Sequence, residues 1–498
     1  MDFASLVATV NAHVWGSVMM FVLVGTGIFL TIRMRLVQVR HFRHAWSLIS
    51  GRWDDPQDHG ETTHLQALST ALSATIGTGN IAGVATGLLS GGPGAIFWMW
   101  VTAALGMCTK FTCCLLAQRY REIDDQGVVA GGPMYYLRDG LGASWLGWLF
   151  ALFAAIAAFG IGNMVQSNSV ADPLARYIGL EQGFTIPGVG FVLWTKLVIG
   201  IVLAVLAALV LIGGVRRIAK VAERIVPVMA AIYVVGAIVI LIARIEAVPE
   251  AFASIFRGAF SATSVGGGLL GYTVMHAVRY GVERGVFSNE AGLGSAAIAH
   301  APAKTKEPIR EGMVAMLGPF IDTITVCTMT ALVILTSGVL GHSTAESSAL
   351  SAEAFETGLP GFGYHVVSFG LVFFAFTTMV GWSYYGDRSV YYLFGRRGPA
   401  AVRAYRWIYV LLIPIGAAVK ISVVWNLSGI FNGLMALPNL IALIGLSGVA
   451  AQMLRDYEER RPSMQPYRTR TDLWFLNLAR GRRKQERADS ISKGDAEL

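Results

Sequence analysis

The residues best suited to binding chemistry form the stretch TIGTGNIAG, residues 75–83, inside a long apolar run. Gly77 and Gly79 each cost roughly 1 kcal/mol in a helix interior relative to alanine, and Thr78 and Asn80 add polar groups. In a bilayer, unwound backbone persists only where it is buried in protein or lines a cavity. There, exposed N–H groups attract a carboxylate, and freed carbonyls with the Asn80 amide oxygen replace water around a cation. Close packing of small residues between two helices is the alternative interpretation.

A second glycine-rich stretch, SATSVGGGLLGYTVM at 261–275, interrupts another apolar run. It lies five predicted spans after the first stretch, so the two segments must cross the membrane in opposite directions. Glycine-interrupted helices at corresponding positions of inverted repeats indicate a transporter site at the membrane midplane. We therefore expect two inverted five-helix repeats, with one extra helix at the N-terminus.

Further polar side chains should converge on this site from the fourth and ninth predicted spans. The candidates are Asn163, Gln166 and Asn168 in the fourth span, and Thr377, Thr378 and Trp382 in the ninth. Thr378 and Trp382 are four residues apart and share one helix face. Taken singly, each threonine could have no role beyond a hydrogen bond to a carbonyl of its own helix, and Trp382 could be a packing aromatic. The hypothesis therefore rests on the convergence of all these side chains and not on any one of them.

One acidic residue, Asp322, lies within a predicted span, and another, Glu290, lies at the end of one. A charge facing lipid at the bilayer centre would cost ~2.5–3.5 kcal/mol on insertion scales, so Asp322 should face protein or water. Asp322, near the middle of the eighth span, is either a structural partner of a buried hydroxyl or amide, or a cation or proton coupling group. Glu290, at the cytoplasmic end of the seventh span, is a candidate for an inner gate, with Arg279 or Arg284 as its partner.

These residues must be positioned by a membrane bundle. The 498 residues are 54% hydrophobic and 14% charged, with a mean hydropathy of +0.56, far outside the range of soluble domains. We predict an all-α integral membrane protein with about eleven spans of roughly 20 residues each. The spans lie near 12–33, 64–90, 94–118, 147–170, 193–214, 222–244, 258–282, 311–339, 363–390, 405–424 and 430–453.

Lys and Arg residues collect in cytoplasmic loops and so predict the orientation. With the N-terminus outside and the C-terminus cytoplasmic, nearly all of the 39 Lys and Arg residues lie on the inner side. The exceptions are Arg176, Lys196, Arg244, Arg257 and Lys420. We expect a multi-pass protein of the plasma (inner) membrane with four parts. They are an N-terminal helix and amphipathic cytoplasmic connector (1–63), two inverted repeats (64–245 and 246–453) and a basic cytoplasmic tail (454–498).

Several other function classes are disfavoured. The four cysteines show no CxxC or Cys/His spacing of a transition-metal site or disulfide framework, and no GxxxxGK[ST] stretch is present. The net charge of +8 follows from topology, so no nucleic-acid partner is needed. An intramembrane enzyme would need a nucleophile and base or paired carboxylates at one depth, which Asp322 and His276 do not offer. A channel would more naturally repeat a short filter by symmetry. We therefore predict a transporter without catalytic residues or a cofactor.

Four motifs resemble the alanine/glycine:cation symporter (sodium:alanine symporter) family. They are GTGNIAGVATG at 77–87, GGPGAIFWMWVTAALG at 91–106, GGPMYYL at 131–137 and VFSNEAGLGSAAIAHA at 286–301. The likeness covers nearly the whole chain to about residue 455. It implies an architecture similar to the bacterial leucine transporter, and uptake of small neutral amino acids with Na⁺, or sometimes H⁺, as the coupling ion.

The resemblance also implies residue roles. The expected substrate-binding residues are Gly77, Thr78, Gly79, Asn80, Gln166, Leu269, Thr273, Thr378 and Trp382. Two cation sites are expected, both for Na⁺: one beside the substrate, and a second between the second and ninth spans. Thr75 and Asn80 belong to the first; Ser73, Ile76, Thr377 and Thr378 form the second.

One departure from the family pattern affects the expected substrate. This chain reads GGLLGYTVMH at 267–276, where the family reads close to GGFAGATVMQ, so Leu269 and Tyr272 replace a phenylalanine and an alanine. We predict Na⁺-coupled (or H⁺-coupled) symport of a small neutral amino acid, alanine or glycine, by alternating access. A pocket reshaped by Leu269 would instead fit a larger neutral amino acid such as glutamine, or a D-amino acid. A non-transporting amino-acid sensor on the same scaffold is a further alternative.

Overall fold

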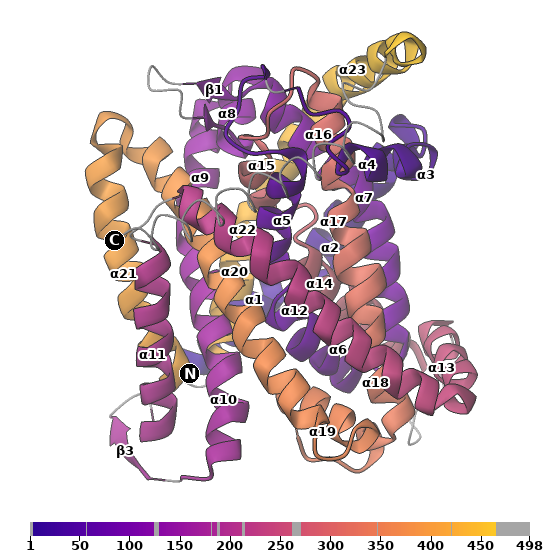
Figure 1. Ribbon diagram of the computed structural model, residues 1–498, viewed down its shortest axis with the longest axis vertical. Helices are drawn as coiled ribbons and strands as arrows, with labels where there is room; N and C mark the ends of the chain where they lie inside the picture. Colours follow the sequence, from indigo (N-terminus) through magenta and orange to yellow (C-terminus); the bar gives the residue numbers. More distant parts are fainter. Residues whose placement is uncertain are drawn as a thin grey trace, which may run out of the picture.

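The computed structural model describes residues 3–55, 57–123, 129–180, 182–186, 190–211, 215–260, 270–345, 347–419 and 421–464. These residues form a helical bundle with two short antiparallel hairpins. Strand β1 (Glu122–Ile123) pairs with β2 (Val129–Ala130), and β3 (Gly183–Ile186) pairs with β4 (Gly190–Leu193). Figure 1 shows α23 (Ser447–Arg460) at one end of the bundle and β3 at the other. We call these the α23 end and the β3 end.

Nine helices of the described residues are long and apolar enough to cross a membrane, and one bent pair gives a tenth span. The bent pair is α5 (His64–Thr75) with Gly79–Gly91, the latter made of η1 (Gly79–Gly83) and α6 (Val84–Gly91). The others are α1 and α2 (Phe3–Val14, Ser17–Arg33), α7 (Gly94–Arg119), α9 with η3 and α10 (Ser144–Phe159, Gly160–Met164, Val165–Ile178), α11 (Trp194–Leu211), α12 (Val215–Ala243), α16 to α18 with η5 (Pro308–Ala315, Leu317–Pro319, Phe320–Cys327, Thr328–Ser337), α20 (Gly363–Phe394), α21 (Gly398–Ala418) and α22 (Ile421–Gly445).

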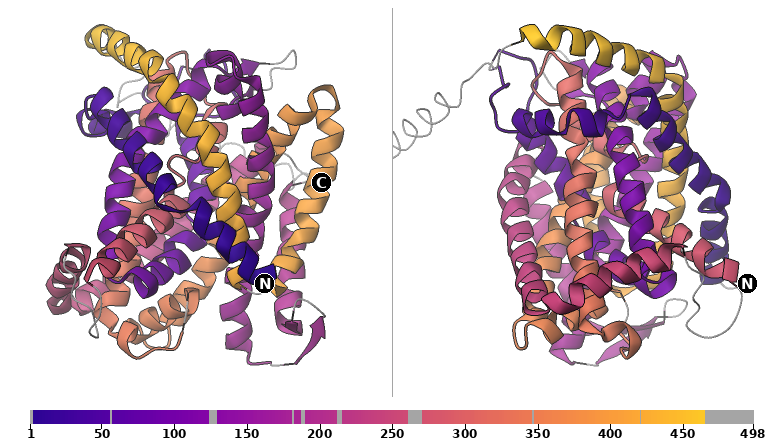
Figure 2. Two further views of the ribbon diagram at one scale, coloured as in Figure 1. Left: turned by 180° about the vertical axis from the view of Figure 1, so that it is seen from behind. Right: turned by 90° about the vertical axis from the view of Figure 1, so that its right-hand side faces the viewer.

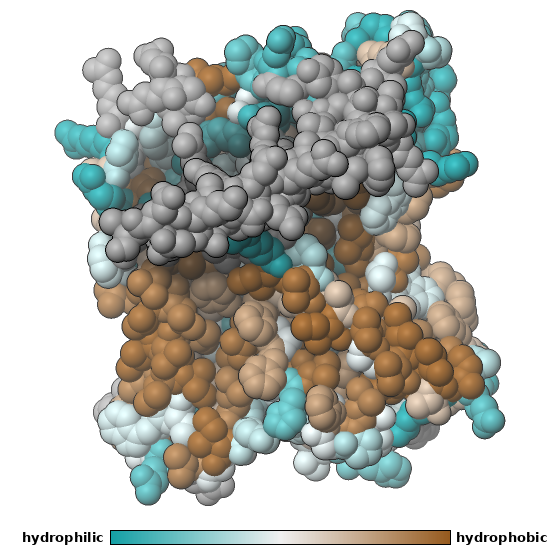
Figure 3. Space-filling model, viewed as in Figure 1, coloured by the Kyte–Doolittle hydropathy of each residue, from teal (hydrophilic) through white to brown (hydrophobic). Residues whose placement is uncertain are grey.

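The outer surface of the bundle has the pattern that a bilayer requires. Figure 3 shows a belt of apolar residues between two polar ends. On α12, the side chains of Val228, Ile232, Val235 and Ile242 are exposed while Tyr233 and Ile240 are buried. A helix that is apolar on both its exposed and its buried faces is typical of a membrane span. The expectation of a multi-pass, all-α membrane protein is confirmed.

The seventh predicted span differs from its expected position. It corresponds to α14 (Leu270–Asn289), which follows a separate helix, α13 (Val248–Phe260). Residues 261–269, which hold Leu269 and most of the glycine-rich stretch, lie outside the described residues, and Gly271 lies inside α14. The described interruption comes downstream, between Asn289 and α15 (Ser295–His300), where three residues have positive φ angles: Glu290, Gly292 and Gly294. Gly271 itself is accommodated in α14, whereas the expected interruption around Gly266, Gly267 and Gly268 lies outside the described residues.

The two broken helices run antiparallel to each other. A Cβ atom added to Gly79 would meet Ser288, one added to Gly87 would meet Arg284, and one added to Gly91 would meet Tyr280. As residue numbers rise along η1 and α6, the numbers of the α14 residues opposite them fall, so the two segments run in opposite directions. This arrangement is the one expected for the first helices of two inverted repeats.

The remaining elements cover the ends of the bundle. Figures 1 and 2 show α4 and α8 toward the α23 end and α19 at the β3 end. Their bounds are α3 (Val37–Arg40), α4 (Phe42–Leu48), α8 (Pro133–Tyr135), η2 (Tyr136–Gly140), η4 (Ile245–Ala247), η6 (Val339–Gly341), α19 (Ser348–Gly358), η7 (Gly395–Arg397) and η8 (Arg461–Ser463). The packed core of the bundle contains both helix breaks.

Candidate substrate and cation site

The first break begins where α5 stops at Thr75, because Ile76 leaves the helical conformation with a ψ of 94°. The Thr378 hydroxyl, from α20, donates to the carbonyl oxygens of Ser73 at 3.1 Å and Ile76 at 3.4 Å. Carbonyls at the end of α5 thus find a partner outside their own helix, as helix ends require. Below this end, α5 and the helix that follows Gly77 are bent by 53°.

Gly77 is held tightly between side chains from two other spans. A Cβ atom at this position would lie 2.5 Å from Thr378 Oγ1 and 3.2 Å from Gln166 Oε1. The Gly77 N–H donates to Asn80 Oδ1 at 2.9 Å, which closes the break into a tight turn. Only glycine fits at this position. The contacts also agree with the sequence prediction that Gly77, Gln166 and Thr378 converge.

Thr78 connects the break to the fourth predicted span. Its N–H lies 3.3 Å from Gln166 Oε1, and Gln166 Nε2 donates to the Ile161 carbonyl in the π-helical turn η3 at 2.8 Å. The Thr78 hydroxyl is buried and has no hydrogen-bond partner among the described residues. Because an unpaired buried hydroxyl is costly, this group is available to a ligand.

Asp322 gathers donors from three elements. Asn80 Nδ2 donates to Asp322 Oδ1 at 2.7 Å, while the hydroxyls of Ser288 and Thr323 donate to Oδ2 at 2.8 Å and 2.7 Å. Asp322 thereby joins η1, α14 and its own π-helical segment η5. Of the two roles considered for Asp322, the geometry is that of a structural partner of buried hydroxyls and an amide. The Asn80 oxygen still has one lone pair free for a cation.

Glu290 directly follows the last residue of α14, at the end of the seventh span as expected, and lies in the second break. Its carboxylate accepts from Trp382 Nε1 at 2.7 Å and from the Ser295 hydroxyl at 2.5 Å. Trp382 packs so closely on Gly162 that a Cβ there would lie 2.1 Å from the Trp382 Cβ. Neither expected arginine partner is used: Arg284 lies 3.7 Å from Glu283 instead, and Arg279 stacks on Tyr280. The run NEAGLG, with its two glycines beside polar residues, is the local sequence pattern that could have indicated this break.

The expected second cation site is brought together in part. Ser73, Ile76 and Thr378 meet where α5 ends. Thr377 instead donates to the Phe373 and Phe374 carbonyls, both at 3.0 Å, and lies 3.9 Å from Met229 Sγ on α12. The hydroxyls of Ser73 and Thr75 also bond back to their own helix, to Thr70 at 2.7 Å and Ala71 at 3.2 Å. Hydroxyls that donate in this way keep lone pairs for a cation.

Two expected substrate residues are not placed. Leu269 lies outside the described residues, and Thr273 belongs to α14 while its side chain is not described. The other expected site residues are buried, so the described part of the site is closed to solvent. Among the described residues, no group of three or more His, Cys, Asp or Glu side chains is suited to a metal ion.

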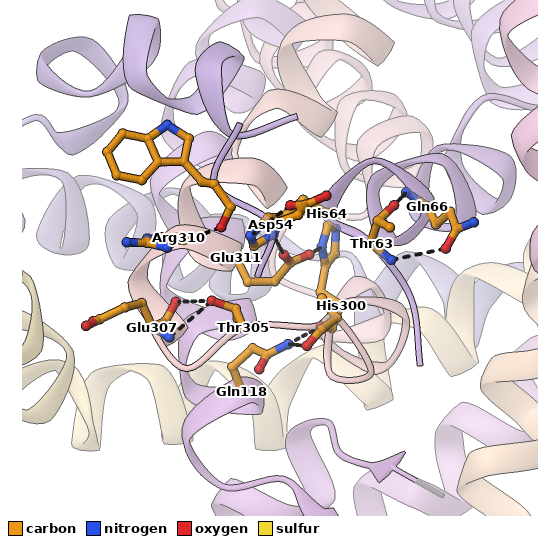
Figure 4. A network of polar contacts seen from close by, with 12 residues as sticks. Asp54, Thr63, His64, Gln66, Gln118, His300, Thr305, Glu307, Arg310 and Glu311 are labelled. Atoms are coloured by element: carbon orange, nitrogen blue, oxygen red, sulfur yellow. Dashed lines mark hydrogen bonds and ion pairs between the residues drawn. The ribbon is translucent and has the colours of Figure 1, made fainter. Parts of the chain in front are cut away.

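Near the α23 end, a buried carboxylate connects the first half of one broken helix, α5, to the second half of the other, α15. Figure 4 shows Glu311 of α16 between His64 of α5 and His300 of α15. His300 Nδ1 lies 2.5 Å from Glu311 Oε1, and His64 Nδ1 bonds to Oε2. Asp54 approaches His64 Nε2 at 3.9 Å. No local pattern could have revealed this network, because 247 residues separate His64 from Glu311.

A membrane bundle with two antiparallel broken helices around a buried polar site defines a secondary transporter of the leucine-transporter fold. The fold is that of MhsT, solved in complex with L-phenylalanine, with a TM-score of 0.54 and 11% identity over 80% of this chain and 99% of MhsT. Residues 1–470 match the model of the sodium:alanine symporter family, and the chain belongs to that family.

Relatives in this family are similar over almost their whole length. The sodium/alanine symporter AgcS of Methanococcus maripaludis is 47% identical over 93% of this chain and 98% of its own. A Bacillus subtilis protein described as a probable sodium/glutamine symporter, GlnT, is 33% identical over 92% of this chain and 91% of its own. The protein is therefore a Na⁺-coupled amino-acid symporter and not an enzyme.

Proposed function

We propose that this symporter takes up a small neutral amino acid, alanine or glycine, together with Na⁺. The observation that supports this is the convergence on Gly77 of Thr378 and Gln166, from spans far apart in the sequence. Beside it, the free Thr78 hydroxyl offers an uncommitted polar group. A short unwound segment of this kind suits the backbone-like groups that all amino acids share.

The residue roles that we propose are those that the family resemblance implies, and the contacts at the first break support them. The backbone of Gly77, Thr78 and Gly79 receives the substrate carboxylate, Gln166 and Thr378 flank it, and Trp382 closes one wall. Na⁺ binds beside the substrate through Thr75 and Asn80. The end-of-helix carbonyls of Ser73 and Ile76, with the threonines 377 and 378, form the second cation site.

Transport proceeds by alternating access around this fixed site, with repeats at 64–245 and 246–453. The N-terminus is outside, and the α23 end of the bundle is cytoplasmic. One Na⁺ crossing ~100 mV contributes ~2.3 kcal/mol, and a tenfold Na⁺ gradient adds ~1.4 kcal/mol. Together these support several-hundred-fold accumulation for each ion.

The network of His64, Glu311 and His300 acts as the inner gate. It ties α5 and α15, the halves of both broken helices nearest the α23 end, to α16. An opening toward that end must separate at least one histidine from the carboxylate. Glu290, which holds the second break to Trp382, couples this gate to the substrate wall.

The test is uptake of radiolabelled L-alanine into proteoliposomes under an inward Na⁺ gradient, with a matched K⁺ gradient as control. Unlabelled glycine, D-alanine, L-glutamine and L-leucine serve as competitors. We expect Na⁺-driven accumulation that glycine suppresses. Binding of amino acids without gradient-driven uptake of any of them would establish a sensor and contradict the proposal.

A larger neutral substrate is the second candidate, and a specific observation favours it. Leu269 and Tyr272 depart from the family pattern, and a relative of this chain is described as a glutamine symporter. Competition by glutamine and not by glycine in the same assay would select this candidate.

A further inference from the structure

Helix α22 carries two buried polar residues without partners. Ser428 is 0% exposed and Asn432 is 1% exposed. Among the described residues, no group bonds to the Ser428 hydroxyl or to either the oxygen or the nitrogen of the Asn432 amide. Buried polar groups in folded proteins are nearly always hydrogen-bonded, so an amide with both ends unpaired needs an explanation.

Neighbouring asparagines on the same helix show that this condition is local. Asn439, two turns further on, accepts from the Tyr136 hydroxyl at 2.5 Å and donates to the Gly292 carbonyl at 2.8 Å. Asn426 accepts from Asn11 Nδ2 at 3.1 Å. Unpaired groups thus occur in the stretch between these two residues, where Ser428 and Asn432 lie.

The unpaired residues face the second helix break. Residues 425, 428, 432 and 439 lie on one stripe of a helix. At one end of the stripe, the Trp425 ring packs on Phe287 with centroids 4.5 Å apart; at the other, Asn439 bonds to Gly292. Ser428 and Asn432 therefore lie opposite residues 287–292, the stretch that contains Glu290.

The same stretch of α22 borders the substrate site on two sides. The Phe287 ring lies 3.5 Å from the Cβ position of Gly79, in the first break. Ser428 packs on Gly160, whose added Cβ would lie 3.0 Å from the Ser428 Cα. Gly160 begins the π-helical turn whose next residues hold Gln166, through the Ile161 carbonyl, and Trp382, through Gly162.

We propose that Ser428 and Asn432 form a subsite for the side chain of the substrate, and that this subsite recognises a neutral carboxamide. The inference rests on the proposed function and widens its substrate class to glutamine. A primary carboxamide carries one acceptor and two donors, which complement both ends of the Asn432 amide and the Ser428 hydroxyl. The methyl side chain of alanine is too short to reach this subsite, so the Asn432 amide and the Ser428 hydroxyl stay unpaired or bond to water. Sites built to bond a substrate group discriminate strongly against analogues that lack it.

The experiment measures inhibition of Na⁺-driven alanine uptake by L-glutamine in proteoliposomes, together with glutamine binding to the detergent-purified protein. We compare the wild type with Asn432→Leu, which keeps the volume and removes both polar groups, and with Ser428→Ala. The control is Asn426→Ala, which removes a partnered amide from another face of α22. We expect the preference for glutamine over alanine to fall at least tenfold in Asn432→Leu, severalfold in Ser428→Ala, and not in the control.

Three outcomes would overturn the subsite. They are equal loss of alanine and glutamine affinity in Asn432→Leu, an unchanged preference in a more stable protein, or no glutamine binding by the wild type. Failure of the proposed function looks different: the purified wild type binds glutamine but shows no gradient-driven uptake. In that case, the ratio of glutamine to alanine binding affinity is compared among the same variants. A fall of this ratio in Asn432→Leu supports the subsite, and an unchanged ratio rejects it.

Discussion

Glu290 and Trp382 are joined by a 2.7 Å hydrogen bond between the carboxylate and the indole Nε1. The bond connects the break in the α14–α15 helix to α20, and both residues are buried. Glu290 is held in the left-handed region with a φ of 56°, a backbone conformation that is rare for residues other than Gly, Asn and Asp. The backbone of the second break therefore depends on partners of this one side chain.

Replacing Trp382 with phenylalanine should disrupt the break while keeping an aromatic wall. The change removes one of the two donors to Glu290, and leaving a buried acceptor short of a partner costs about 1–3 kcal/mol. We expect the apparent affinity for alanine to weaken roughly 5- to 100-fold, with a lower melting temperature. Binding and thermal unfolding of purified protein measure both. The exposed Trp407→Phe is the control, and equal behaviour of the two variants would contradict the role of the bond.

Replacing Gly77 with alanine should abolish most transport. The new methyl group would lie 2.5 Å from Thr378 Oγ1, so either the break or α20 must move. Overpacking of a well-packed interior costs typically about 1–3 kcal/mol. Gly83→Ala is the matched control in the same segment, because nothing lies within 4 Å of its Cβ position. The measurement is the initial uptake rate of each variant at equal surface expression. Transport at the wild-type rate by Gly77→Ala would refute the close packing around Gly77.

Exchanging the partners Asn80 and Asp322 tests whether they act as a pair. Asn80→Asp places a second carboxylate against Asp322 and removes the 2.7 Å donor, so it should destabilise the protein and prevent Na⁺-dependent binding. Asp322→Asn restores an amide opposite the new carboxylate. We expect the double variant to recover folding relative to Asn80→Asp, with a coupling energy of roughly 0.5–3 kcal/mol. A double-mutant cycle on unfolding provides the measurement, and strict additivity would show that the two residues are independent.

Replacing Glu311 with glutamine should loosen the α23 end. The neutral side chain cannot accept from both histidines with the strength of a carboxylate, since hydrogen bonds to charged groups are worth about 1.5–3 kcal/mol. We expect a lower melting temperature and greater accessibility of residues on α5 to reagents applied from the α23 end. Glu459→Gln, on the exposed surface of α23, should change neither property. A Glu311→Gln protein as stable as the wild type would remove the network from the proposed gate.

The class of the protein and the first break were predictable from local sequence. Apolar runs of membrane-spanning length need no tertiary information, because lipid selects for them segment by segment. Likewise, Gly77, Thr78, Gly79 and Asn80 weaken a helix through their own backbone and side-chain preferences. The convergence of Gln166 and Thr378 on Gly77 was predicted from the inverted-repeat pattern, and the structure shows these contacts.

The second break shows where local reasoning reaches its limit. Glycine content pointed to residues 266–271, of which the structure describes only Leu270 and Gly271, both helical, whereas the described chain unwinds at residues 290–294. A single glycine weakens a helix by about 1 kcal/mol, and packing against neighbouring helices readily exceeds that amount. Unwinding at Glu290 is stabilised instead by Trp382, 92 residues away, and by Ser295.

The sequence by itself thus determined a symporter-type membrane bundle, the first break and the residues that gather there. Only the tertiary structure decided which buried polar groups are paired. It assigned Asn80 to Asp322, Glu290 to Trp382 and two histidines to Glu311, and it left Ser428 and Asn432 without partners. The reason is physical: helix breaks and spans arise from nearby residues, whereas hydrogen-bond partners in a bundle meet only after helices far apart in the chain have packed.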